Sequence, residues 1–183
     1  FTVTYNGGRR VVKIYRTAAN FKQMYEYMKP DPRFAGVSGT KLSVIYAWAK
    51  KEFRNLHRAR ARGITVPVPI AVYKNILVLE HIDGEQLRVD PPSDPKGFYE
   101  KLISEMIALH KAGLVHTDIS EYNVLNFEEK PILIDFSHAV DLRYPNVQRH
   151  LKRDVRNVVK YFQKLGVELD EETEFKKIWT AKK

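Results

Sequence analysis

Two pairs of short stretches in the first half of the chain have the hydrophobic pattern of β-strands. The stretches are 1–5 with 10–15, and 70–73 with 76–80. Asn6-Gly7-Gly8 separates the first pair and Lys74-Asn75 separates the second, and both are turn sequences that join antiparallel strands. The pattern therefore predicts two hairpins in a small antiparallel sheet.

Apolar residues recur every three or four positions in three longer segments, which is the period of an amphipathic helix. Each segment is followed by a glycine, a residue that commonly terminates helices. The predicted helices are 41–62, 98–112 and 147–165, with a short last one at 173–180. Two apolar stretches, 124–127 and 131–134, predict short strands between the second and third helices. The second half is therefore expected to be mostly helical.

Two segments lack a clear period. Residues 17–40 contain two prolines and two glycines among charged and aromatic residues, and predict a partly ordered, flexible insertion. Residues 83–97 are rich in proline and predict a hinge and connector. We therefore expect an α+β fold with two lobes. The small lobe is 1–82, the connector is 83–97 and the mostly helical lobe is 98–183.

One acidic residue lies inside an apolar helix face. In the helix predicted at 41–62, Glu52 lies four residues after Trp48 and four residues before Leu56, both of which belong to the apolar stripe. An unpaired buried carboxylate costs on the order of several kcal/mol. The sequence therefore predicts a cationic partner opposite Glu52.

The composition narrows the classes of protein to which the chain can belong. Of its 183 residues, 44% are hydrophobic and 29% are charged, which is typical of a folded, soluble protein. The chain has no cysteine, which excludes disulfides and thiolate chemistry, and no apolar run has the roughly 20 residues of a membrane span. We therefore expect no membrane partner.

Charge and the start of the chain add three expectations. The formal net charge of +9 favours phosphate-rich partners such as nucleotides or RNA. Because the chain opens without a signal peptide, we expect a cytoplasmic location. Because it opens without methionine inside a predicted strand, we expect a further segment before Phe1.

The strongest chemical pattern lies between His116 and Asp135. Asp118 follows His116 by two residues, Asn123 comes five residues later, and Asp135 follows after twelve more, at the end of a predicted strand. Phosphoryl transfer needs an acceptor for the proton of the attacking hydroxyl, and oxygen ligands that hold Mg²⁺ against the phosphates. Asp118 suits the first role, and Asn123 and Asp135 suit the second. Each residue alone is typical of a turn cap, so the joint spacing carries the prediction.

These residues and their neighbours resemble the RIO family of atypical serine/threonine kinases, and most closely its type-1 branch. The similar stretches are 50–56, 114–123, 133–140 and 153–157. The resemblance covers essentially the whole chain. It implies a trimmed, bilobal protein-kinase-like fold that uses ATP with Mg²⁺ or Mn²⁺. It also implies that His116 and Asp154 support the catalytic loop rather than carry out chemistry.

The resemblance assigns the nucleotide-binding residues as well. Lys13, in the stretch 11–15, matches the lysine that contacts the α- and β-phosphates of ATP, and Glu52 matches its ion-pair partner. The C=O of Glu80 and the N–H of Ile82 match the backbone groups that bind adenine. The resemblance and the position of Glu52 in its helix therefore lead to the same pair.

The chain departs from ordinary protein kinases in three places. Only 18 residues separate Asp135 from Asp154, without an Ala-Pro-Glu sequence, so we expect no activation segment and no platform for an extended peptide. Ser120 stands where ordinary protein kinases have a lysine, which removes one contact to the γ-phosphate. The chain has no glycine-rich phosphate loop, and we expect that loop before Phe1.

We therefore expect an ATP- and Mg²⁺-dependent phosphotransferase that acts on a protein serine or threonine, or on itself. The resemblance implies a role in small ribosomal subunit maturation, with a pre-40S or 30S-type particle or its rRNA as partner. It also leaves open an ATPase in which phosphate passes transiently to Asp135. Two alternatives remain. One is a non-catalytic, nucleotide-gated assembly factor that binds pre-ribosomal RNA, and the other is a small-molecule phosphotransferase of the aminoglycoside type.

Overall fold

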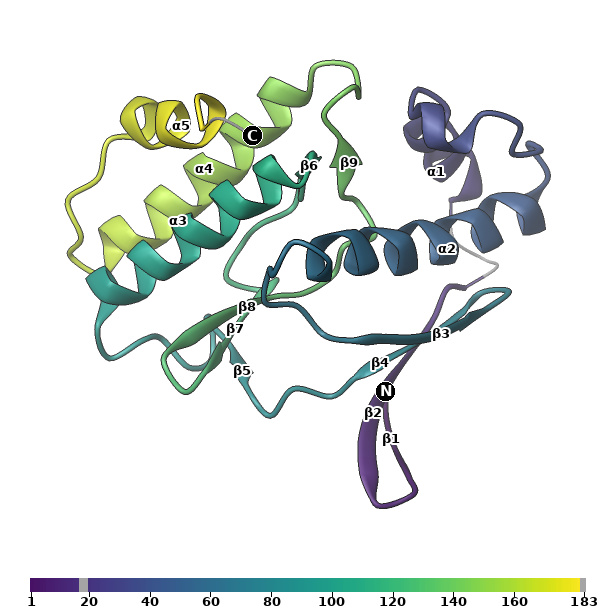
Figure 1. Ribbon diagram of the computed structural model, residues 1–183, viewed down its shortest axis with the longest axis horizontal. Coiled ribbons are helices and arrows are strands. Elements are labelled where there is room, and N and C mark those ends of the chain that lie inside the picture. Colours follow the sequence, from purple (N-terminus) through teal and green to yellow (C-terminus); the bar gives the residue numbers. More distant parts are fainter. Residues whose placement is uncertain (17–19, 182–183) are drawn as a thin grey trace.

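The computed structural model describes residues 1–16 and 20–181. Its helices are α1 (Phe21–Met28), the 3₁₀ turn η1 (Pro32–Phe34), α2 (Lys41–Arg60), α3 (Pro95–Lys111), α4 (Val147–Lys164) and α5 (Glu171–Trp179). Its strands are β1 (Thr2–Tyr5), β2 (Gly8–Ile14), β3 (Pro69–Tyr73), β4 (Ile76–Glu80), β5 (Glu85–Gln86), β6 (Leu114–Val115), β7 (Val124–Phe127), β8 (Lys130–Leu133) and β9 (Val140–Asp141). The fold is α+β: a four-stranded sheet and α2 lie on one side, and α3, α4 and α5 are grouped on the other (Figure 1).

The four-stranded sheet contains both predicted hairpins. Its strand order is β1-β2-β4-β3, and all neighbouring strands are antiparallel. In the central pair, Lys13 of β2 lies opposite Leu77 of β4. The sheet therefore places Lys13 next to the strand whose last residue is Glu80.

Helix α2 runs across the sheet (Figure 1) and buries the apolar stripe that the sequence predicts. Val44, Ile45 and Trp48 are buried along it, and Glu52 is completely buried. The helix ends at Arg60, two residues before the predicted end, and Gly63 follows with a φ of +77°. A residue with a Cβ rarely adopts this left-handed conformation, which explains the glycine there.

Two helices of the second half begin earlier than the apolar pattern predicts, whereas α4 begins at Val147 as predicted. Helix α3 begins at Pro95 rather than at 98, because the Asp94 side chain accepts the Gly97 N–H at 3.0 Å and proline suits the first helical position. Helix α5 begins at Glu171 rather than at 173, because Asp170 caps it through the Thr173 N–H at 2.8 Å. Capping residues thus extend both helices beyond their apolar faces.

Residues 20–40 differ from the sequence expectation of a partly ordered insertion. Here α1 and η1 pack against α2, and Met28, Phe34 and Trp48 form a small buried cluster with Val44. Asp31, also completely buried, caps η1 by accepting the N–H of Arg33 at 3.0 Å. Apolar residues at 21, 24, 25 and 28 follow the i, i+3, i+4, i+7 spacing of an amphipathic helix, a short stripe that the sequence analysis missed beside the prolines and glycines of 30–39. The part of the expectation that concerns 17–19 lies outside the described residues.

Two short sheets frame the chemical residues. In the first, β5, which lies in the predicted connector, pairs with β7, and β7 pairs with β8. β7 has the bounds that the sequence predicts, and β8 begins one residue earlier than predicted. In the second, β6 pairs with β9, and these two strands are too short for a sequence pattern. β6 leads directly into His116, and β9 closes the loop that follows Asp135. One hydrophobic core contains residues from both sides of 83–97, and the boundaries of the lobes stay a prediction. Within 1–16 and 20–181, no helix is long and apolar enough to cross a membrane.

Candidate active site

Five of the residues predicted from the sequence line one cavity of about 370 Å³ between the sheet and the helical half. They are Lys13, Glu80, Ile82, Asn123 and Asp135. Apolar side chains form much of the remaining wall, including Val11, Leu56, Leu79, Leu125 and Ile134. The cavity thus has an apolar part that suits a flat base and a charged end that suits phosphates.

Lys13 lies between two carboxylates. Its Nζ is 2.8 Å from Glu52 Oε1 and 3.0 Å from Asp135 Oδ1. The cation predicted opposite Glu52 is therefore Lys13, and Tyr15, which the sequence analysis did not identify, donates its hydroxyl to Glu52 Oε2. Burial alone would lower the pKa of Lys13, but the two carboxylates outweigh it and raise that pKa. Lys13 is therefore a fixed positive charge inside the cavity.

Asp135 is held ionised in an unusual backbone conformation. Its φ is +61°, in the left-handed region that a non-glycine residue rarely adopts. Burial would raise the pKa of Asp135, but Lys13 and Ser137 outweigh it and hold the pKa at about 2. Residues in this region cost on the order of 1–3 kcal/mol and cluster at functional sites. The conformation directs an ionised carboxylate toward Lys13.

Asn123 connects the candidate base to the candidate metal site. Its Nδ2 donates to the backbone oxygen of Asp118 at 2.8 Å and to Asp118 Oδ2 at 2.9 Å. This leaves the Asn123 Oδ1 as the side-chain atom that can bind a cation. Mg²⁺ in proteins is held by one or two carboxylates, other oxygen atoms and the phosphates of a substrate. Asn123 and Asp135 line the same cavity and fit that donor set.

His116 and Asp154 hold the backbone of the loop that carries Asp118. The Nε2 of His116 lies 2.9 Å from the carbonyl oxygen of Ile134, and burial lowers the pKa of His116 to about 4. The two oxygens of Asp154 accept the N–H groups of Thr117 at 2.7 Å and Ile119 at 3.1 Å. Asp154 binds the backbone through both of its oxygens and His116 through its Nε2, while the buried Nδ1 of His116 has no hydrogen-bond partner among the described residues. Neither side chain lines the cavity that contains Lys13, so the geometry suits a supporting role.

Helix α2 contributes two further residues that the sequence analysis did not assign. Lys51 donates to the carbonyl oxygens of Ser137 and Ala139, both at 2.7 Å. Asn55 donates to the carbonyl oxygens of Phe136 at 3.1 Å and Ala139 at 2.9 Å. Both side chains are completely buried, and they fix the loop after Asp135. The sequence did offer a signal for these two residues. They lie four positions apart, on one face of the helix and next to the apolar stripe that contains Glu52, which indicates polar side chains directed toward the core.

Asp118 faces a second cavity of about 690 Å³ on the other side of the loop. Thr117, Ser137, Tyr27 and Trp48 also line it. Asp118 is exposed, so a substrate group in this cavity can reach its carboxylate. The loop thus separates the cavity that contains Lys13 and Asp135 from the cavity that contains Asp118. We call the first cavity the nucleotide side and the second the acceptor side, after the roles that the sequence predicts.

The chain matches the family model of the RIO domain over residues 1–177. It is 41% identical to the RIO-type serine/threonine-protein kinase Rio1 of Haloferax volcanii over 165 residues, which are 87% of this chain and 57% of that protein. It is 33% identical to the protein of the same name from Thermoplasma acidophilum, covering 87% of each. The chain therefore belongs to the RIO domain family, and both relatives are named as kinases.

The solved structures show the same fold. A crystal structure described as the Rio2 kinase-ADP/Mg²⁺-phosphoaspartate complex from Chaetomium thermophilum superimposes with a TM-score of 0.69 at 24% identity. The match covers 96% of this chain and 57% of that one. The kinase-like fold expected from the sequence is thereby confirmed.

Proposed function

We propose that this chain transfers the γ-phosphate of Mg²⁺-ATP to a serine or threonine hydroxyl of a protein. One observation carries the proposal: Lys13, Asn123 and Asp135 converge in one cavity, and Asn123 links them to Asp118 on the acceptor side. The names of the relatives, which are RIO-type serine/threonine kinases, support the same activity. Mn²⁺ would satisfy the same oxygen ligands as Mg²⁺.

Each residue then has a role set by its position. Lys13 neutralises the α- and β-phosphates, and Glu52 keeps Lys13 in place. Asn123 and Asp135 would hold Mg²⁺, which would neutralise the negative charge of the phosphates. The acceptor hydroxyl attacks the γ-phosphorus, its proton passes to an Asp118 oxygen, and the bond to the ADP oxygen breaks.

We propose that the base occupies the apolar part of the cavity, where the backbone groups of Glu80 and Ile82 bind adenine. The Ile82 N–H makes no backbone hydrogen bond to any residue in 1–16 or 20–181, so it is free to donate to a ring nitrogen. Glu80 is held in place because its Oε2 accepts the Val68 N–H at 2.9 Å. Adenine would thus be recognised without any side-chain hydrogen bond.

An ATPase cycle is the second candidate, because the Rio2 structure from Chaetomium thermophilum is described as a phosphoaspartate complex with ADP and Mg²⁺. In this chain the Asp135 carboxylate would attack the γ-phosphorus, release ADP and later lose its phosphate to water. Its low pKa keeps that carboxylate ionised and able to act as a nucleophile.

Labelled ATP distinguishes the two cycles. With γ-labelled ATP, Mg²⁺ and a protein substrate, we expect a stable phosphoserine or phosphothreonine whose formation falls by about 10²–10⁴-fold in Asp118→Asn. Hydroxylamine-labile label that is lost in Asp135→Asn would establish the ATPase cycle instead. The exposed Glu168→Gln is the matched control. Absence of any transfer by the wild type would overturn both and favour a non-catalytic nucleotide-binding factor.

We propose, as the physiological setting, small ribosomal subunit maturation in the cytoplasm. The net charge of +9 supports a partner that contains RNA. Co-sedimentation with small-subunit precursor particles at 50 and 200 mM salt tests this. We expect binding that weakens as salt rises, and salt-independent binding or none would contradict it.

A further inference from the structure

Helix α4 has two faces of opposite character. The inward face is apolar and contains one acid, Asp154, which is bound to the backbone of the loop before Asp118. The outward face carries four basic residues spaced three or four positions apart, which places them on one side of the helix. They are Arg149, Lys152, Arg153 and Arg156.

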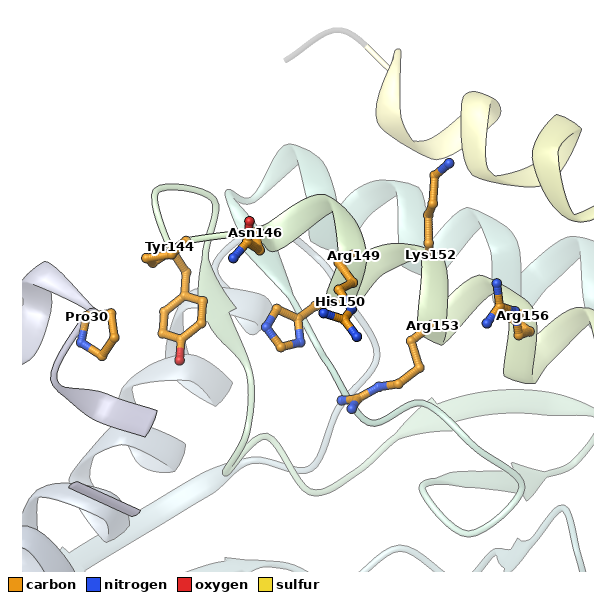
Figure 2. Close-up of a pocket in the computed structure, with 9 residues that line it drawn as sticks. Pro30, Tyr144, Asn146, Arg149, His150, Lys152, Arg153 and Arg156 are labelled. Atoms are coloured by element: carbon orange, nitrogen blue, oxygen red, sulfur yellow. The ribbon is translucent and has the colours of Figure 1, made fainter. Parts of the chain in front are cut away.

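The basic face borders a cavity of about 630 Å³ that the proposed transfer reaction does not use. Pro30 and Tyr144 form its other side, and Figure 2 shows Arg149, His150 and Arg153 grouped between Tyr144 and the rest of α4. None of the described residues that line this cavity is acidic. The cavity is therefore a concave, positively charged surface rather than a solvated helix face.

Two of the four cations are already neutralised. Lys152 points toward α5 (Figure 2) and lies 3.3 Å from Glu172, and Arg156 lies 3.1 Å from Glu171. Arg149 has no carboxylate partner among 1–16 and 20–181, and Arg153 donates to the backbone oxygen of Thr117. Arg149 and Arg153 thus supply the charge of the cavity. Burial lowers the pKa of His150, and the positive charges of Arg153 and Arg149 lower it further.

The basic cavity adjoins the acceptor side of the active site. His150 and Arg153 line both this cavity and the one that contains Asp118. Side chains next to a hydroxyl at Asp118 can therefore reach Arg153 and then Arg149, which requires only the few adjacent residues and no platform for an extended peptide.

We propose that this cavity binds acidic side chains of the protein substrate next to the serine or threonine that is phosphorylated. The inference rests on the proposed function and adds a substrate preference to it. Two arginines without carboxylate partners match carboxylates in charge and in geometry. The Asp118 cavity is lined mostly by neutral side chains, such as Asn20, Gln23 and Met24, which suit a polypeptide. A single-stranded nucleic acid would need cations along its whole path.

Paired peptides test the preference. One peptide has a serine flanked by aspartate and glutamate, and its partner has asparagine and glutamine at the same positions. With wild-type protein we expect a KM for the acidic peptide that is at least about fivefold lower, which is the scale of one or two exposed ion pairs. Arg149→Ala should remove most of this difference, and Arg149→Glu should reverse it. Lys160→Glu, on an exposed position of α4 outside the cavity, is the control of equal charge change and should have no effect.

The outcomes separate this inference from the proposed function. Equal KM values for the two peptides, or an acidic preference that survives in Arg149→Glu, would overturn the inference and leave the kinase activity intact. If no peptide is phosphorylated, the proposed function fails, and fluorescence anisotropy of the labelled acidic peptide tests the cavity alone. Binding that Arg149→Glu abolishes supports the site. Displacement of the peptide by a single-stranded RNA oligonucleotide, but not by an acidic competitor peptide, would overturn it.

Discussion

Lys13 shows how one side chain organises the charges of the site. It bridges a completely buried carboxylate on α2 and an ionised carboxylate in the loop after β8, with both oxygens within 3.0 Å of its Nζ. In the proposed function, the phosphates of the nucleotide are a further anionic partner for the same cation. The buried position of Glu52 was predictable from its helix face, whereas the contact from Lys13 to Asp135 was not, because 122 positions separate them in the sequence.

Replacement of Lys13 tests its proposed role. We expect Lys13→Met to weaken ATP binding by about 10- to 100-fold, because a hydrogen bond to a charged group contributes roughly 1.5–3 kcal/mol. Lys74→Met, at an exposed turn of the same sheet, should bind ATP as the wild type does. Calorimetric titration measures both, and equal affinities for wild type and Lys13→Met would refute the assignment.

His116 predicts how stability depends on pH. Its pKa falls to about 4 in the folded protein from an ordinary value near 6.5, so the unfolded state binds more protons between these values. The stability that a neutral His116 contributes is therefore complete above pH 6.5 and is lost as the pH falls toward 4.

His116→Gln tests this linkage while keeping a donor for the Ile134 carbonyl. We expect the free energy of unfolding of the variant to decline less steeply between pH 7 and pH 5 than that of the wild type, in urea titrations. His57→Gln, at an exposed position, should keep the wild-type slope. Equal slopes for wild type and His116→Gln would contradict a neutral, buried His116.

Helix α2 acts as the link between the sheet and the loop that carries Asp135. Glu52 contacts Lys13 on the sheet, and Lys51 and Asn55 make four hydrogen bonds to the backbone of 136–139. Ordinary kinases position this region through an activation segment, which the chain has no room for between Asp135 and Asp154. The hydrogen bonds from α2 provide a fixed alternative.

Asn55→Leu tests this link. The substitution keeps most of the volume but removes two buried hydrogen bonds, to the carbonyl oxygens of Phe136 and Ala139. At roughly 0.5–1.5 kcal/mol for each bond, the loss is about 1–3 kcal/mol. We expect a loss of stability of that size in urea unfolding, together with a lower kcat, because the Asp135 loop loosens. Arg54→Leu, at the exposed neighbouring position, should change neither. A variant with wild-type kcat and lowered stability would show that Asn55 supports the fold alone.

Among the helices and strands, the sequence predicts the long elements better than the short ones. The stripe of α2 and the turn sequences of both hairpins have clear patterns, and the structure contains these elements close to the predicted bounds. The two-residue strands β6 and β9 have none, because only their pairing with each other defines them. Helix α1 has a stripe of only two turns, which packs in the Met28 cluster and which the sequence analysis missed beside the prolines and glycines that follow it. The start of α3 was predictable from Asp94 and Pro95, but the apolar pattern alone placed it three residues late.

The whole molecule brings together the proposed nucleotide cavity, the loop that carries Asp118 and the basic face of α4. The sheet supplies Lys13, the loop between β6 and β7 supplies Asp118 and Asn123, and α4 supplies Arg153 and Arg149. The spacing from His116 to Asp135 indicates phosphoryl transfer, which stays a prediction, and the net charge of +9 indicates an anionic partner. Only the fold shows where that charge gathers, because Lys152 and Arg156 are neutralised by α5 while Arg149 is not.

The most direct test of the account is a calorimetric titration of the protein with ATP in the presence and absence of Mg²⁺. The account predicts one ATP per chain, and an affinity that Mg²⁺ strengthens in the wild type and in Glu168→Gln. In Asp135→Asn this strengthening by Mg²⁺ should disappear, because the substitution removes the ionised metal ligand. Binding that is equally strong without Mg²⁺, or unchanged in Asp135→Asn, would contradict the assignment of the site.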